Sequence, residues 1–304
     1  MYSRNDDFTY DSQGRIEPTY ENLLHIFCTD PELGHIRFDT RAGRAIDVSL
    51  SESPTSMVFR QSEHEFVHNL PALEKYVASV YNIDGLTVSL VAGAYDEYLK
   101  FFAYDPVQEY LRSLKWDGFS RLGLVLPGST GTREDYELAK RIFVGSVKRV
   151  LYPGSQQDFV PVFLGDTGGD IGMWLNLIGA GYTGFFPSPN LNSLALPEQT
   201  WLAVHDVSDK NSQPALRDFY NKSTRAWYVS NNGEGLQHRN WVTWGITSNQ
   251  YLKENNPLPG KLLFIEAPEV FDLEKYFEKY FENSHGISNE FRNQVWSEAV
   301  HLAK

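Results

Sequence analysis

The chain has 304 residues and a formal net charge of -12, and 41% of its residues are hydrophobic and 14% aromatic. This length and composition are typical of a folded protein of about two domains and exclude a disordered chain. The acidic balance opposes a diffuse nucleic-acid-binding surface, because neutralising phosphates requires clustered Lys and Arg. The single cysteine, Cys28, excludes an intramolecular disulfide, and we expect it to be buried and structural.

The first third of the chain predicts an arm followed by a small domain. Residues 1–17 are polar and lack periodicity, which predicts a flexible arm outside any core. Residues 18–104 alternate helical and strand patterns, which predicts a mixed α+β accessory domain. The predicted elements are a helix that starts near Thr19 and runs through Phe27, a hairpin over 36–48, and helices over 69–81 and 87–101.

The middle of the chain predicts a helical connector over 105–157. Asp105 and Pro106 cap a helix that ends near Leu114, before a glycine turn at Gly118. A long amphipathic helix is predicted over 133–152, with its apolar side chains on one face.

Residues 158–268 predict an α/β domain. Three short apolar runs, over 159–164, 201–205 and 241–247, are typical of buried parallel strands, although Pro161 weakens the first. Helical stretches separate them, and such alternation favours an α/β sheet. Residues 269–304 predict two C-terminal helices, over 271–281 and 288–303, which form either a packed lid or a partner surface.

A glycine-rich segment lies between the first of these strands and a helix that starts near Met173. A loop that cradles phosphates needs glycines where backbone amides approach, a Lys for the terminal phosphates and a Ser or Thr for magnesium. With Gly165 as the first glycine of that pattern, Asp170 replaces the second, Ile171 the Lys and Gly172 the hydroxyl residue. A plain turn is the alternative interpretation. The candidate loop residues are Gly165, Gly168, Gly169, Asp170, Ile171 and Gly172.

Residues 105–118, which contain the Trp-Asp-Gly triplet, resemble the segment that precedes the ATPase core in the virulence-associated protein E family of phages and mobile elements. Further landmarks of that family match at 163–172, 201–206 and 247–249, and the resemblance extends over about 19–268. It implies a P-loop ATPase-like (AAA+/superfamily 3 helicase-like) α/β core with a smaller mixed α+β N-terminal domain. The sequence has no stretch of roughly 18 to 20 apolar residues and no apolar signal segment after Met1, so we expect a cytoplasmic protein without membrane contact. If a phage or mobile element encodes the chain, as the resemblance implies, that cell is a bacterial host.

The resemblance places the family's magnesium-binding acid on Asp206 and its catalytic carboxylate on Val207. Its sensor residue falls on Asn249, and Lys261 is what remains of an Arg pair. Valine cannot orient an attacking water, so the motifs imply a pseudo-ATPase with no catalytic residue and no metal. We therefore expect no bound cofactor, and ATP with magnesium is the alternative. Asp206 as a loop-capping acid and Asn249 as a turn residue are the alternatives.

The leading hypothesis is a non-hydrolysing relative of a replication ATPase that acts as a scaffold or modulator through protein contacts, with itself or with an active ATPase. A DNA-binding replication protein is one alternative. A weakly active ATPase or helicase is another, in which Lys261 supplies the missing charge. The candidate DNA contacts are Lys148, Arg149, Arg225 and Arg239, and solvated helix faces are the alternative explanation for these charges.

Overall fold

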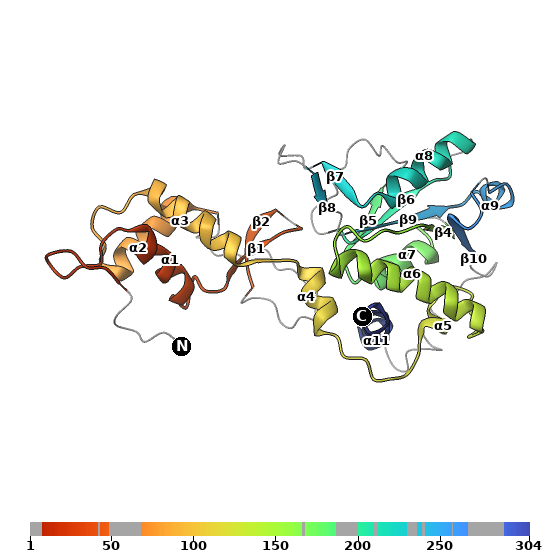
Figure 1. Cartoon of the computed structure of the whole chain (residues 1–304), viewed down its shortest axis with the longest axis horizontal. Helices are drawn as coiled ribbons and strands as arrows, with labels where there is room; N and C mark the ends of the chain where they lie inside the picture. Colours follow the sequence, from red (N-terminus) through yellow and green to blue (C-terminus); the bar gives the residue numbers. More distant parts are fainter. Residues whose placement is uncertain are drawn as a thin grey trace. The chain divides into compact units, whose positions relative to one another are not determined.

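The computed structural model in Figure 1 describes residues 8–41, 43–48, 68–165, 168–186, 200–209, 212–229, 236–238, 241–256, 258–266 and 289–304. The chain divides into two compact units, Met1–Pro106 and Val107–Lys304. Each unit has its own sheet and is described by itself.

The first unit combines three helices with a small sheet, as the sequence predicts. Thr19 caps α1 (Tyr20–Thr29), because its hydroxyl accepts from the backbone amide of Asn22. Strands β1 (Ile36–Asp39) and β2 (Arg44–Asp47) form the predicted antiparallel hairpin, and β3 (Ala103–Tyr104) adds to β1 in parallel. The remaining helices are α2 (Leu70–Tyr81) and α3 (Val88–Phe101).

Part of the predicted N-terminal arm belongs to this unit. Phe8 and Ile16 are partly buried against its core, and the Thr9 amide donates to Oδ1 of Asn22 at 3.0 Å. The expectation of a free arm is therefore wrong for residues 8–17, because two apolar side chains in a polar stretch are enough to hold it. Cys28 is also a correction, since its side chain is exposed on α1 and not buried.

The second unit is built on a five-stranded sheet in which every pair is parallel. Its strands in spatial order are β10, β4, β9, β6 and β5. The strand that comes first along the chain in this unit, β4, therefore lies inside the sheet. Their bounds are β4 (Val160–Leu164), β5 (Thr183–Phe186), β6 (Leu202–Asp206), β9 (Val242–Thr247) and β10 (Leu262–Glu266). An antiparallel pair, β7 (Trp227–Val229) and β8 (Leu236–His238), precedes β9.

Pro161 is tolerated inside β4 for a geometric reason. The Val160 amide donates to the Lys261 carbonyl on the β10 side, so the next backbone nitrogen faces β9. The ladder between β4 and β9 starts only at Val162. The missing N–H of Pro161 therefore removes no bond from the sheet.

Helices cover both faces of this sheet. On one face, α8 (Gln213–Thr224) and α9 (Gln250–Glu254) pack Phe219 and Leu252 against β4 and β10. On the other face, Trp174 of α7 (Asp170–Ile178) and Phe143 of α6 (Arg133–Leu151) contact the aromatic side chains of the strands. The helices α4 (Pro106–Ser113), α5 (Leu122–Val125) and α11 (Asn289–Ala303) complete the unit.

The C-terminal helix α11 is part of the core of this unit. Trp296 is 0% exposed, and its ring lies 4.3 Å from that of Trp201 and 4.7 Å from that of Phe143. The predicted connector, 105–157, contributes α6 to the same core. The interpretation of α11 as a partner surface is therefore wrong, and the predicted helix over 271–281 lies outside the described residues.

Candidate functional site

The candidate loop leaves the carboxyl end of β4 and enters α7. The Gly165 amide donates to the carbonyl of Thr247 at 2.8 Å, which ties the start of the loop to the end of β9. Gly169 is the N-cap of α7, and no side chain caps this helix end. A strand, a glycine loop and a helix N-terminus thus follow each other in the order that a phosphate-binding loop requires. Asp166 and Thr167 lie outside the described residues.

Ile171 occupies the position of the phosphate-binding Lys, and its side chain is turned inward. It is 6% exposed, and a Cβ built on Gly165 would lie 2.8 Å from both Cβ and Cγ1 of Ile171. Gly165 is therefore needed to admit this packing contact. The side chain at this position lies against the loop's first glycine, away from the space in front of the helix where phosphates would bind.

Asp170 is exposed in the first turn of α7. A carboxylate there stabilises a helix N-terminus by about 0.3–1 kcal/mol, because it interacts with the unpaired backbone amides. The same negative charge repels a phosphate at this position. Gly172, at the position of the magnesium hydroxyl, is buried and has no side-chain oxygen.

The ends of β6 and β9 meet beside the loop and form what we call the edge cluster: Asp206, Ser208, Thr247, Ser248 and Asn249. Asp206 Oδ1 accepts from the Ser208 amide at 2.9 Å, as a loop-capping acid does. Ser208 Oγ accepts from Thr247 Oγ1 at 3.3 Å and from the Ser248 amide at 3.1 Å. These polar groups therefore hydrogen-bond to one another at the carboxyl ends of the strands.

Asn249 serves two structural contacts in this cluster. Its Oδ1 accepts from the Tyr251 amide at 3.1 Å as the N-cap of α9, and its Nδ2 donates to the Ser208 carbonyl at 3.3 Å. The position that the family resemblance assigns to a catalytic carboxylate holds Val207, which is 0% exposed and packs with Phe219 of α8. No carboxylate can be presented from that position.

Lys261 lies at the opposite edge of the sheet from the loop. Its carbonyl accepts from the amide of Val160, the first residue of β4, and its Nζ lies 5.1 Å from the centre of the Tyr220 ring. Val160 and Leu164 are about 13 Å apart along the strand at ~3.3 Å per residue. Lys261 therefore cannot supply the missing charge to the loop of its own chain, which corrects its grouping with this site.

A different lysine lies at the loop's edge of the sheet. Lys253 of α9 forms an ion pair with Glu266, which is the last residue of β10 and the register partner of Leu164. The sequence alone does not reveal this pair, because Glu266 belongs to a strand, β10, that the sequence does not predict. Both side chains are substantially exposed, so such a pair adds about 0–1 kcal/mol to stability.

The basic residues divide into buried and exposed groups. Arg149 is 1% exposed and donates to the carbonyls of Arg225 at 3.0 Å and Thr224 at 3.3 Å, at the C-terminal end of α8. Burial lowers the pKa of Arg149 to about 10. The prediction of a DNA contact is therefore wrong for Arg149. Lys148 and Arg225 are exposed, and Arg239 lies outside the described residues.

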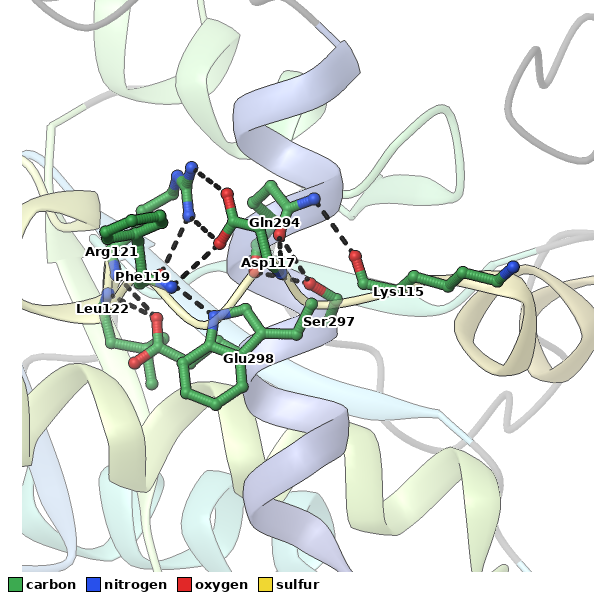
Figure 2. Close-up of polar contacts among 9 residues, drawn as sticks. Lys115, Asp117, Phe119, Arg121, Leu122, Gln294, Ser297 and Glu298 are labelled. Carbon is green, nitrogen blue, oxygen red and sulfur yellow. Dashed lines mark hydrogen bonds and ion pairs between the residues drawn. The ribbon is translucent and has the colours of Figure 1, made fainter.

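The Trp-Asp-Gly segment binds α11 and forms with it what we call the clamp: residues 115–122 with Gln294 and Glu298 (Figure 2). Glu298 is 1% exposed, and its carboxylate accepts from Ser120 Oγ at 2.6 Å and from the amides of Arg121 and Leu122 at 2.6 and 3.1 Å. Gln294 accepts from the Asp117 amide at 3.0 Å. The segment thus lies against the C-terminal helix and hydrogen-bonds to it.

The described part of the chain contains neither a metal-ligand cluster nor a membrane-spanning helix. Among these residues, no group of three His, Cys, Asp or Glu side chains is placed to hold a metal ion. No described helix has the length and apolar character that a bilayer span requires.

The parallel sheet, with its first strand inside and a glycine loop leading into a helix N-terminus, defines an α/β protein with a P-loop-like core. Residues 111–186 match the model of the virulence-associated protein E-like domain. The predicted resemblance to the virulence-associated protein E family is therefore confirmed over these residues, which include the end of the Trp-Asp-Gly segment, the strand β4 and the candidate loop.

Comparison with solved structures gives a distant likeness to the apo A form of the NrS-1 C-terminal region, at 15% sequence identity and a TM-score of 0.39. The likeness covers 64% of this chain and 47% of that chain, so this chain spans about half of its length. The assignment of a P-loop-like core rests on the strand order and the loop geometry. No curated protein matches the chain significantly.

Proposed function

We propose that the chain is a replication-related protein of a phage or mobile element, and that its P-loop-like core binds protein partners and does not hydrolyse ATP. The observation that carries this proposal is the inward packing of Ile171 on Gly165. An alkyl side chain turned into the core leaves the loop without the cation that binds terminal phosphates.

Three further requirements of phosphoryl transfer lack their residues in this chain. The magnesium hydroxyl position holds the buried Gly172, the water-orienting position holds the buried Val207, and Lys261 lies at the other edge of the sheet. Asp170 adds a negative charge where the triphosphate would lie. A weakly active ATPase that relies on Lys261 is therefore not supported within one chain.

Calorimetry of ATP and ADP with magnesium, on protein whose mass is measured by light scattering in the same buffer, tests this proposal. We expect no binding up to about 1 mM nucleotide, the upper end of ordinary substrate affinities. Micromolar binding would contradict the proposal, and the variant Asp206→Asn then shows whether that binding uses the vestigial magnesium position.

The partner of such a scaffold is a second copy of the chain or an active replication ATPase, as the family resemblance implies. Tagged protein, recovered from cells that carry the encoding element, should retain its partner after nuclease treatment. Loss of every partner on nuclease treatment would favour a DNA-binding role instead.

One observation supports DNA binding as the second candidate function. Lys148 and Arg225 are both exposed at the junction where Arg149 joins α6 to the end of α8, and the antiparallel pair β7 and β8 starts at Trp227, two residues after Arg225. Two cations at the base of a hairpin form a local basic patch on an otherwise acidic chain. This arrangement agrees with the expectation that any DNA contact is local.

Fluorescence anisotropy with labelled single-stranded DNA tests this candidate. The double variant Lys148→Glu and Arg225→Glu should weaken binding and reduce the dependence of affinity on salt. Lys100→Glu, a charge reversal at an exposed position of the first unit, is a control that should leave binding unchanged. Equal weakening by the control would mean that only net charge matters.

A further inference from the structure

The segment from Lys115 to Arg121 is held in its conformation by hydrogen bonds between its own residues. The guanidinium of Arg121 binds both oxygens of Asp117, at 2.8 and 2.6 Å, and Trp116 Nε1 donates to the Phe119 carbonyl at 3.0 Å. Gly118 permits the turn, because its φ of +90° is a conformation that side chains with a Cβ rarely adopt. These contacts close within the segment and do not require α11.

The contacts of this segment with α11 are mostly polar. They are the bonds of the Ser120 hydroxyl and the Arg121 amide to Glu298 and the two bonds of Gln294 to Lys115 and Asp117 (Figure 2). In addition, the Trp116 ring lies 4.7 Å from that of His301. Phe119 is 72% exposed and points away from any core. The segment therefore has little apolar surface that would hold it on the helix.

The helix α11 is held in a different way. Val295, Trp296 and Ala299 are fully buried, and Trp296 contacts Trp201 and Phe143 and donates to the Ile178 carbonyl at 2.8 Å. Those partners belong to the sheet and its helices and not to the segment. Removing the segment would leave these contacts intact.

We infer that residues 115–121 are a strap that lifts off α11 as one preformed piece, while α11 stays packed in the core. Lifting exposes the Glu298 carboxylate to water, which replaces the two donors of Ser120 and Arg121 that it loses, while the amide of the buried Leu122 remains a donor, so the open state leaves no buried unpaired charge. Segments with few buried apolar contacts open at lower free energy than the core that carries them. The inference concerns the Trp-Asp-Gly segment and does not depend on the proposed function.

Residue-resolved hydrogen exchange on the full chain tests the strap. The amides of Asp117 and Arg121 bond to side chains of α11, whereas the Phe119 amide bonds to Asp117 Oδ1 inside the segment. If the strap lifts as one piece, the first two amides exchange together and at least tenfold faster than those of Val295 and Ala299. The Phe119 amide then stays slower than these two.

Substitutions in α11 sharpen the test. Glu298→Gln and Gln294→Ala should each raise exchange of the strap amides by about tenfold and leave α11 and β4 protected. Glu254→Ala, at an exposed acid of α9, is the control and should change neither. Exchange of α11 at the same rate as the strap overturns the inference, and so does exchange of Phe119 at the rate of Asp117, which would mean fraying. Since Gln294→Ala keeps the buried carboxylate, it remains informative if Glu298→Gln unfolds.

Discussion

The edge cluster and the clamp are two polar clusters of the same unit, and they differ in charge, in burial and in bond length. In the edge cluster, Ser208 is joined to the buried Thr247 and the exposed Ser248 by bonds of 3.1–3.4 Å between neutral groups. Its one carboxylate, that of Asp206, is half-buried and accepts a bond of 2.9 Å. In the clamp, a carboxylate that is 1% exposed accepts three bonds of 2.6–3.1 Å. Bonds to an ionised group are roughly twice as strong as neutral ones.

This difference shows where the chain retains strong polar contacts. The position suited to nucleotide chemistry has small polar side chains that hydrogen-bond to one another and to nearby backbone amides. In contrast, the buried carboxylate of the C-terminal helix receives its bonds from the segment that carries the family resemblance and from the residue after it. The buried side chains of Trp296, Trp201 and Phe143, which we call the aromatic layer, pack that helix against the sheet and α6. We therefore expect substitutions near the helix to change stability far more than substitutions at the loop.

The largest effect is expected at the centre of the aromatic layer. Trp296→Ala should lower the free energy of unfolding by about 4 kcal/mol, because it leaves a cavity against Trp201 and Phe143. Met173→Ala is the control, since Met173 is half exposed on α7 and should change stability by less than ~0.5 kcal/mol. Denaturant unfolding followed by fluorescence of the remaining tryptophans measures both. A change below that of the control would contradict the core role of α11.

The next effect separates two adjacent basic residues. Arg149→Ala should destabilise the second unit by about 2 kcal/mol, since the carbonyls of Thr224 and Arg225 lose their donors and a buried side chain is removed. Lys148→Ala, one residue earlier and exposed, should be close to neutral. Thermal unfolding of the two variants compares them directly. If Lys148→Ala proved the more damaging, the division between buried and exposed basic groups would be wrong.

A smaller effect tests the interpretation of the loop. Gly165→Ala should cost about 1.5 kcal/mol, because the new Cβ would lie 2.8 Å from Ile171. Adding Ile171→Ala should recover part of that loss, since the clash with Cγ1 disappears while that with Cβ remains. A double-mutant cycle in urea measures the coupling. Strictly additive effects would mean that the two residues do not pack as described.

The sequence predicts most of the strand and helix positions, because buried parallel strands give apolar runs and capped helices give local signals such as Thr19. It does not predict β5 or β10. The strand β5 (Thr183–Phe186) is only partly buried and contains a glycine, and β10 follows a turn at Gly260 with no alternation to mark it. These two strands are the outer strands of the sheet, on either side of the three strands that the apolar runs predict.

The candidate site is predictable in its order along the chain and not in its geometry. The alignment of Gly165, Asp206 and Asn249 follows from motif spacing, and the structure brings the carboxyl ends of the corresponding strands, β4, β6 and β9, to one edge of the sheet. Lys261 follows the sensor position in sequence, which groups it with them, yet it lies at the other end of the strands. Which end of a strand a loop residue occupies depends on a register that the sequence does not show.

The smallest effect concerns pH and the ion pair inside the strap. The Arg121 guanidinium and the Phe119 amide hold the pKa of Asp117 at about 2, below its ordinary 3.8. Because the folded value is the lower one, the pair stabilises the strap above about pH 4, and this contribution is lost as the pH falls towards 2. Asp117→Asn removes the charge, so the difference in exchange of the Phe119 amide between wild type and variant should be present at pH 5 and shrink towards pH 3. The Phe119 amide reports the pair because it donates to Asp117 Oδ1 inside the segment, and its exchange at these pH values is corrected for intrinsic rates. A difference that does not change with pH would show that Asp117 acts through its backbone contacts and not through its charge.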